Sequence, residues 1–265
     1  MRADLPQFGL GTWQNDDPDA CARSVQTALD AGYRHVDTAQ AYGNEAAVGR
    51  GIRAADVDRE DVFLATKVDT GNLAYDDVLE TTAESLDRLG VDAVDLLYVH
   101  WPIDAYDAES TLAAFDELYE AGAIRNVGVS NFEPRHLAAA RDLLDAPLFA
   151  NQVEMHPLLQ QSDLLAEARD HDEWLVAYSP LARGAVTDVP ELQAVAEKHD
   201  ATPAQVSLAW LLGKGVPVIP KATSEAHIRE NWAARDLDLD ADDVERIESI
   251  DREERFVDFE AAPWN

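Results

Sequence analysis

The chain has 265 residues, of which 46% are hydrophobic, and this is ample for the core of one large α/β domain. Its 52 acidic residues against 21 basic ones give a net charge of −31, which excludes nucleic acids and anionic membranes as partners at ordinary salt. The single cysteine, Cys21, excludes an intrachain disulfide and fits a reducing compartment, so we expect a cytoplasmic protein.

Short apolar runs alternate with longer amphipathic segments from one end of the chain to the other. The runs are bounded by turn or helix-capping residues, as is typical of buried parallel strands. They predict eight strands, over residues 8–11, 33–37, 62–67, 94–100, 124–130, 148–154, 174–179 and 216–220. The amphipathic segments predict helices, with N-caps at Asp76, Ser110, Ser162 and Thr202.

Eight strand–helix units in this length predict a (β/α)8 barrel, also called a TIM barrel, that forms one domain over residues 1–265. An open, doubly wound parallel sheet is the alternative. The first residues contain no secretory apolar region, and no stretch approaches about 18 consecutive apolar residues. We therefore expect neither an export signal nor a membrane span.

Polar side chains end most of the predicted strands. Asp37 ends the second strand, with Tyr42 in the loop beyond it, and Lys67 and His100 end the third and fourth. Each alone fits a structural role, such as a helix cap, a lysine that reaches solvent or a core histidine. Together they indicate an active site, because catalytic residues of such barrels gather at the carboxyl ends of the strands. Asp37 and Lys67, on neighbouring strands, can also neutralise one another.

At eight places the chain resembles the aldo-keto reductase superfamily, in the family's order and at compatible spacing. The matching stretches are “FGLGTWQ”, “GYRHVDTAQAYGNEAAVG”, “TK”, “LLYVHWP”, “GVSNF”, “NQVEMHP”, “YSPLARG” and “VIPKATS…IREN”. The resemblance covers the whole chain and is greatest to the short prokaryotic members similar to 2,5-diketo-gluconate reductases. It implies a (β/α)8 barrel that reduces the carbonyls of small aldehydes, dicarbonyls or keto sugars with a nicotinamide cofactor.

The resemblance places the family's catalytic tetrad on Asp37, Tyr42, Lys67 and His100. It implies that Tyr42 protonates the carbonyl oxygen while hydride reaches the carbon. An ordinary tyrosine pKa of about 10 is high for an acid at neutral pH, and the Lys67 ammonium is expected to lower it. Asp37 would keep Lys67 charged and oriented, and His100 would donate a hydrogen bond to the carbonyl oxygen.

The resemblance also implies an extended nicotinamide dinucleotide on the barrel rim, which agrees with the lack of a strand–GxGxxG–helix unit. Ser130, Asn131 and Gln152 match the residues that bind the carboxamide, and Tyr178 matches the aromatic that stacks on the nicotinamide ring. The remaining cofactor residues implied are Thr12, Trp13, Asp37, Ser179, Leu181, Lys221, Thr223, His227, Glu230 and Asn231.

The residues expected near the 2′-phosphate decide between NADP(H) and NAD(H). Lys221 and Thr223 would lie near the 2′-phosphate of NADP(H), with Glu230 and Asn231 near the adenine. Relatives committed to NADPH usually carry arginine where this chain has His227. Arginine is always charged, whereas histidine is mostly neutral at pH 7, so we expect NADP(H) first and NAD(H) as a second cofactor.

Aromatic residues are expected to line the substrate pocket. Trp13, Trp101 and Phe132 match such positions in relatives, beside Tyr42 and His100. The segment 255–265 carries further aromatics, which favour a docked tail over a disordered one. These are Phe256, Phe259 and Trp264.

Two other functions stay open. A nucleotide-binding regulatory barrel without turnover, similar to potassium-channel β subunits, is disfavoured by the intact tetrad and by the lack of an N-terminal extension. A metal-dependent hydrolase could use His35, His100 and His156, but no HxH or HExxH cluster occurs. We therefore expect no metal.

The acidic residues are spread along the whole chain, and only four of the 21 basic residues are lysine. This bias resembles that of proteins from salt-in halophilic archaea, in which high salt screens the repulsion between acidic groups. We expect a halophilic protein that acts as a monomer.

Overall fold

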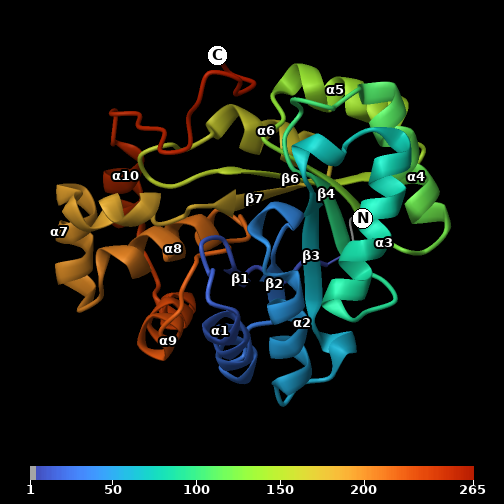
Figure 1. The fold of residues 1–265 in the computed structure, drawn as a ribbon. Coiled ribbons are helices and arrows are strands. Elements are labelled where there is room, and N and C mark those ends of the chain that lie inside the picture. Colours follow the sequence, from blue (N-terminus) through green and yellow to red (C-terminus); the bar gives the residue numbers. More distant parts are fainter. Residues whose placement is uncertain (1–3) are drawn as a thin grey trace.

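Seven short parallel strands form the wall of a barrel in the computed structural model, which describes residues 4–265 (Figure 1). Neighbours in the sheet follow chain order from β1 to β7. The strands are β1 (Gly9–Gly11), β2 (His35–Asp37), β3 (Phe63–Val68), β4 (Leu96–Val99), β5 (Val127–Ser130), β6 (Leu148–Glu154) and β7 (Trp174–Tyr178).

The eighth segment, residues 216–221, closes the barrel between β7 and β1 through isolated parallel bridges. Val218 bridges both Phe8 and Ala177. Pro217 and Pro220 have no backbone N–H, so the segment donates fewer ladder hydrogen bonds than a regular strand. Both proline carbonyls still accept hydrogen bonds, from the N–H of Ala177 and of Gly11 respectively. The predicted (β/α)8 barrel is confirmed, with its last strand reduced to bridges.

Helices surround the barrel. One helix follows each of the first six strands, two lie between β7 and the closing segment, and two follow that segment. The helices are α1 (Pro18–Asp30), α2 (Glu45–Ala54), α3 (Tyr75–Leu89), α4 (Ala108–Glu120), α5 (Pro134–Leu143), α6 (Ser162–Asp170), α7 (Pro190–His199), α8 (Pro203–Gly213), α9 (Glu225–Ala233) and α10 (Ala241–Glu248). No helix within residues 4–265 is both long and apolar enough to cross a membrane.

The structure confirms one of the four predicted N-caps and corrects the other three. Thr202 caps α8 and forms a capping box with Gln205, as predicted. Asp107 caps α4 in place of Ser110, because its carboxylate accepts from the Ser110 N–H at 2.9 Å. The other two residues lie inside their helices: α3 begins before Asp76, and Ser162 is the first residue of α6.

Alternation along the strands decides which side chains enter the barrel. In β3, Leu64 and Val68 pack outward against the helices, whereas Ala65 packs in the barrel interior with Tyr98. Lys67, two residues beyond Ala65, therefore also faces inward, and its register partner on β4 is Tyr98. The strand periodicity thus carries a lysine into the core at the carboxyl end of the barrel.

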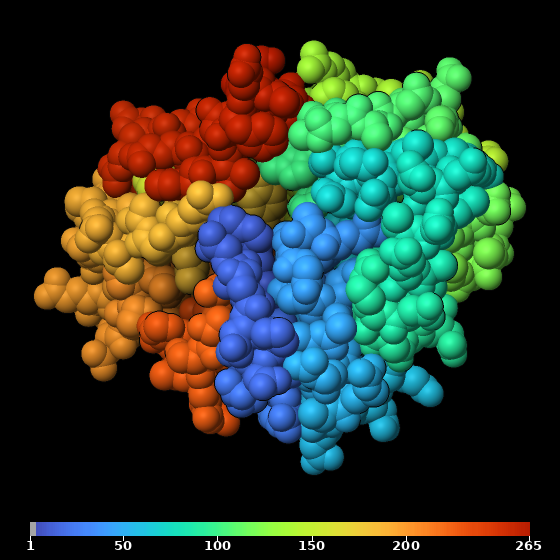
Figure 2. All heavy atoms as spheres, in the orientation of Figure 1, coloured from blue at the N-terminus to red at the C-terminus, as the bar shows by residue number. Residues whose placement is uncertain are grey.

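The C-terminal tail, residues 251–265, packs across the helices on the carboxyl side of the barrel (red in Figures 1 and 2). Arg252 forms an ion pair with Glu191 at the start of α7, at 2.8 Å. At the other end, the Arg135 guanidinium of α5 donates to the carbonyl of Pro263 at 3.0 Å. The expectation of a docked tail is confirmed.

Candidate active site

A cavity of about 300 Å³ opens at the carboxyl ends of the strands. Loops after several different strands contribute to its wall, as the barrel architecture predicts. The structure brings the following predicted site residues together in the lining: Thr12, Trp13, Asp37, Tyr42, His100, Trp101, Ser130, Asn131, Gln152, Tyr178, Ser179 and Lys221.

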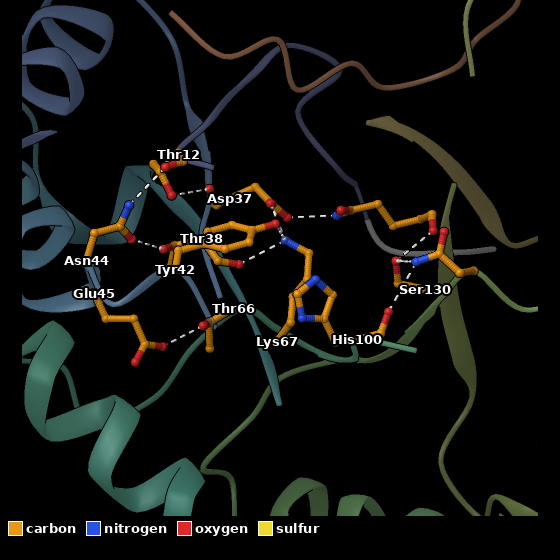
Figure 3. Close-up of polar contacts among 12 residues, drawn as sticks. Thr12, Asp37, Thr38, Tyr42, Asn44, Glu45, Thr66, Lys67, His100 and Ser130 are labelled. Carbon is orange, nitrogen blue, oxygen red and sulfur yellow. Dashed lines mark hydrogen bonds and ion pairs between the residues drawn. The ribbon is translucent and has the colours of Figure 1, made fainter. Parts of the chain in front are cut away.

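Lys67 is a buried cation in the wall below this cavity (Figure 3). Its ammonium forms an ion pair with one carboxylate oxygen of Asp37 and donates to the Thr38 carbonyl at 2.9 Å. It also donates to the Tyr42 hydroxyl oxygen at 3.4 Å. The second Asp37 oxygen accepts from the Gln152 amide at 2.7 Å. The two buried charges are therefore paired and hydrogen-bonded, as their removal from water requires.

Tyr42 is held by the turn on which it lies. It ends the short 3-10 turn η1 (Gln40–Tyr42), which follows β2. The Gln40 side chain donates to the Thr81 carbonyl at 3.1 Å and accepts from the Asp69 N–H at 3.0 Å. Just beyond the turn, the Asn44 amide donates to the Thr12 carbonyl, in the loop after β1, at 2.9 Å. These bonds fix both ends of the turn and aim the phenol ring at Lys67.

The pKa of Tyr42 differs from the prediction. Burial raises the pKa of Tyr42 above its ordinary value, and the Lys67 ammonium opposes this shift without reversing it. The expectation of a lowered pKa is wrong for this state, because the loss of water outweighs the nearby cation. For Lys67, burial alone lowers the pKa, but the Asp37 carboxylate and the Tyr42 hydroxyl outweigh it, and the net pKa is raised. At neutral pH the site therefore holds a protonated phenol beside a charged ammonium.

His100 faces Tyr42 across the cavity. The two ring centroids are 5.8 Å apart, in an edge-to-face arrangement. Burial, with the Lys67 ammonium as a second cause, lowers the pKa of His100 to about 3. The imidazole is therefore neutral at neutral pH and can donate from one ring nitrogen. An oxygen between Tyr42 and His100 would have two uncharged donors.

Another part of the cavity wall is a group of side chains that are joined by hydrogen bonds. The Asn131 amide donates to the Ser130 hydroxyl at 3.0 Å and to the His100 carbonyl at 3.2 Å. The Tyr178 hydroxyl donates to the Asn131 side-chain oxygen at 2.8 Å. Ser130 in turn donates to the Gln152 carbonyl at 2.8 Å. The residues predicted to hold the nicotinamide ring and its carboxamide thus form one connected group.

Two cations line the cavity as well. Lys221 comes from the closing segment of the barrel, and Arg183 from the loop after β7. Among residues 4–265, neither forms an ion pair with a carboxylate; the Arg183 guanidinium instead lies 4.8 Å from the centroid of the Trp13 ring. In a chain of net charge −31, two cations without acidic partners make this part of the cavity locally favourable for an anion.

Five predicted cofactor residues lie outside the cavity lining. Thr223 and His227 are exposed, and the His227 N–H bonds the Ser224 hydroxyl that caps α9. Thr223 precedes α9 and His227 lies in its first turn, so a ligand reaching past Lys221 would meet them. The other three are half-buried or buried: Leu181, Glu230 and Asn231.

The structure also separates Phe132 from the cavity. Phe132 is fully buried and packs edge-on against the rings of Tyr106 and His136. The backbone turns just before it, at Asn131, where φ is 63°. Five lining residues were not among the predicted site residues: Gly11, Ala41, Arg183, Ile219 and Val257. The first four lie inside the stretches that carry the family resemblance, and only Val257 had no such signal.

The remaining histidines occupy separate places. His35 is buried at the start of β2, in register with Gly9 and Phe63, and burial lowers its pKa to about 4. His156 lies 3.1 Å from a carboxylate oxygen of Glu154. Within the described range, residues 4–265, no group of three or more histidine, cysteine or acidic side chains is arranged to hold a metal ion.

The fold and its site match one class of enzymes, the barrel oxidoreductases that act on carbonyls. The chain belongs to the Aldo/keto reductase family, whose sequence profile matches residues 7–252. An aldo-keto reductase of Mycolicibacterium smegmatis is 40% identical over 253 residues, covering 95% of this chain and 92% of the relative. Methylglyoxal reductase DkgB of Escherichia coli O157:H7 is 39% identical over 266 residues, covering 98% and 99%.

Solved structures agree with this assignment. A crystal structure assigned as a 2,5-diketo-D-gluconic acid reductase B superposes with a TM-score of 0.93 at 38% identity, covering 97% of this chain and 92% of that one. The protein is therefore an oxidoreductase that reduces carbonyl groups with a nicotinamide cofactor, which confirms the predicted family and reaction class.

Proposed function

We propose that this reductase converts small aldehydes, dicarbonyls or keto sugars to alcohols, with NADPH as the preferred donor and Tyr42 as the acid. The observation that carries the proposal is the position of the Lys67 ammonium, which contacts both Asp37 and the Tyr42 hydroxyl beside an open cavity. A nicotinamide cofactor, when bound, would supply hydride to the carbonyl carbon. Tyr42 supplies the proton that the carbonyl oxygen needs.

The raised pKa of Tyr42 makes the phenol a weak acid, so the proposed proton transfer depends on Lys67. The phenol is protonated at neutral pH and ready to donate. As the proton leaves, negative charge develops on the phenol oxygen, 3.4 Å from the Lys67 ammonium. Lys67 thus stabilises a charge that is present in the transition state and absent in the ground state, which is the requirement for catalysis. His100, neutral and facing Tyr42, orients the carbonyl oxygen by a second hydrogen bond.

The cavity fits a nicotinamide dinucleotide phosphate. The connected group formed by Ser130, Asn131 and Gln152 offers donors and acceptors for a carboxamide, and the Tyr178 ring is placed beside them. Lys221 and Arg183, which form no ion pair within residues 4–265, offer positive charge for phosphate groups. Beyond Lys221, the first turn of α9 adds the positive end of a helix and the exposed His227 side chain.

The size of the cavity supports a small substrate. At about 300 Å³ it lies at the lower end of the volumes usual for ligand sites, and the nicotinamide ring must share it. Trp13 and Trp101 provide an apolar wall beside the proposed acid. Two similar proteins carry the names methylglyoxal reductase and 2,5-diketo-D-gluconic acid reductase, both of which denote dicarbonyl substrates.

We also infer a monomeric enzyme that works in the cytoplasm of a halophilic cell. One chain supplies the whole cavity, and Cys21 is a buried free thiol. An excess of 31 negative charges favours a salt-rich setting, in which the self-repulsion is screened.

The test is the loss of nicotinamide absorbance with a panel of carbonyls that includes methylglyoxal, a keto sugar and a bulky aromatic aldehyde. NADPH and NADH are compared, with EDTA as the control for a metal. We expect turnover of the small dicarbonyl that is faster with NADPH and unaffected by EDTA. No consumption of either cofactor with any small carbonyl would refute the proposal.

A further inference from the structure

Glu154, at the end of β6, is a fully buried carboxylate beside the active site but outside the cavity lining. One of its carboxylate oxygens accepts from the backbone N–H of Phe256 at 2.8 Å and lies 3.1 Å from the His156 ring nitrogen. The other oxygen accepts from the backbone N–H of Val257 at 3.0 Å. Two of the donors that compensate this buried charge therefore come from the C-terminal tail, about 100 residues further along the chain.

The electrostatics agree with a carboxylate that depends on the tail. Burial by itself raises the pKa of Glu154, but the hydrogen bonds from His156, Phe256 and Val257 outweigh it, and the net pKa is lowered. A buried anion without these donors would be costly. The charge of Glu154 and the docking of residues 256–257 consequently stabilise each other.

The anchored segment continues directly into the cavity wall. Val257 lines the cavity. Phe259 and Trp264 then pack against Trp101, with ring centroids 4.9 Å and 5.6 Å away, and Trp101 also lines the cavity. The Arg255 guanidinium lies over the Trp264 ring, 3.8 Å from its centroid. The tail thus closes the tryptophan-lined end of the cavity, on the side of the proposed substrate.

We propose that Glu154 is a positioning residue that determines substrate size, because its carboxylate holds the tail closed over the substrate end of the cavity. The proposal rests on the proposed function for the identity of the substrate. Release of the tail removes Val257 and the support of Trp101 from the wall. Small carbonyls then lose contacts, whereas bulky ones gain room.

The test compares Glu154→Gln with Asp95→Asn in the full-length protein. Glutamine keeps the shape of Glu154 but removes the charge and one of the two acceptors. Asp95 is the matched control: it is a buried carboxylate that also accepts a backbone N–H, from Leu64 at 2.9 Å, at the opposite end of the barrel. Two measurements are made: the rate of tryptic cleavage after Arg252 and Arg255, and KM for methylglyoxal and for a bulky aromatic aldehyde.

We expect Glu154→Gln to speed cleavage in the tail about tenfold or more, while Asp95→Asn does not. The KM for methylglyoxal should rise about 5- to 20-fold, with a smaller change in kcat, and the KM for the bulky aldehyde should rise less or fall. The affinity for NADPH should stay within about twofold. A merely structural role would instead lower stability without changing the ratio of the two KM values.

Tail cleavage and a KM ratio equal to those of the wild type would overturn the proposal. If Glu154→Gln does not fold, Val257→Pro removes one tail donor and leaves Glu154 intact; unchanged cleavage in that variant would overturn the proposal equally. The cleavage assay needs no substrate, so absence of carbonyl reduction in the wild type would refute the proposed function separately.

Discussion

The Lys67 ammonium and the Tyr42 hydroxyl lie 3.4 Å apart, and the lysine reaches this position from inside a barrel strand rather than from a surface loop. The phenol keeps its proton at neutral pH, since the ordinary tyrosine pKa of about 10 already lies well above 7 and burial raises it further. The ammonium is present before the reaction begins, so no group has to reorganise when the phenolate forms. In the proposed mechanism, Tyr42 gives up its proton only when a carbonyl oxygen is there to take it.

The ion pair between Lys67 and Asp37 should show strong coupling in the free energy of unfolding. Lys67→Met leaves the buried Asp37 carboxylate without its cation, and we expect a loss of about 3–5 kcal/mol in the free energy of unfolding. Asp37→Asn combined with Lys67→Met should be less destabilising than the sum of the two single changes. Denaturant unfolding of the four proteins measures this coupling.

An exposed pair provides the control for this cycle. Arg229 and Glu225 lie one turn apart on α9, and both side chains are more than half exposed. Their cycle, with Arg229→Met and Glu225→Gln, should give a coupling of about 0.5 kcal/mol or less. Equal coupling in the two cycles would show that Lys67 and Asp37 do not depend on one another.

Stability should fall in mild acid because of His35. Burial lowers the pKa of His35 from its ordinary value of 6.5 to about 4 in the folded protein. Between these values the unfolded chain binds the proton more tightly, so the stabilisation is complete above pH 6.5 and is lost as the pH falls toward 4. The loss attributable to His35 is about 3 kcal/mol.

His35→Leu should remove this part of the pH dependence. Denaturant unfolding of both proteins at pH 7 and pH 4.5 isolates the effect, since His100, which also has a lowered pKa, is present in each. If the difference in stability between wild type and variant is the same at both pH values, His35 does not titrate as the structure indicates.

Cofactor preference should depend on Lys221 more than on His227. Lys221 has no acidic partner within residues 4–265, whereas Arg229, the nearest arginine on α9, is occupied by Glu225. We expect an NADPH over NADH preference of roughly 10- to 100-fold in kcat/KM, the worth of one charged hydrogen bond. Lys221→Ala should nearly abolish it, and His227→Arg should strengthen it. A wild type that prefers NADH, and does so equally after Lys221→Ala, would contradict the phosphate site.

Activity and stability should rise with salt. The net charge of −31 makes the folded state repel itself at low ionic strength, and the Debye length falls from about 10 Å at 0.1 M to about 3 Å at 1 M. Thermal unfolding and turnover measured from 50 mM to 2 M KCl test this expectation, with NaCl as the second salt. A melting temperature that is constant across the series would rule out a halophilic adaptation.

The barrel was predictable because its signals are local. Each strand is a short apolar run between turn residues, and β3 and β6 appear at the expected positions almost to the residue. The last strand was less predictable, because “VPVIP” has the hydrophobicity of a strand but its two prolines remove ladder donors. The cap prediction failed at Ser110 because α4 starts earlier: Asp107 accepts the Ser110 N–H, which places Ser110 inside the helix.

The site residues that lie at the ends of strands were predictable. Asp37, Lys67 and His100 end neighbouring strands, so parallel register brings them together whatever the loops do. Phe132 and Val257 were not predictable in the same way. The first is turned away by one left-handed residue, Asn131, and the second comes from a tail whose course depends on packing far along the chain.

The most direct test of the mechanism is Tyr42→Phe, which removes only the proton donor. Turnover of methylglyoxal with NADPH is measured at pH 7 for wild type and variant, together with the affinity of each for NADPH and the unfolding free energy. We expect kcat to fall by about 10²- to 10⁴-fold, with cofactor affinity and stability nearly unchanged. Turnover by Tyr42→Phe within threefold of the wild type would show that the proton comes from another group.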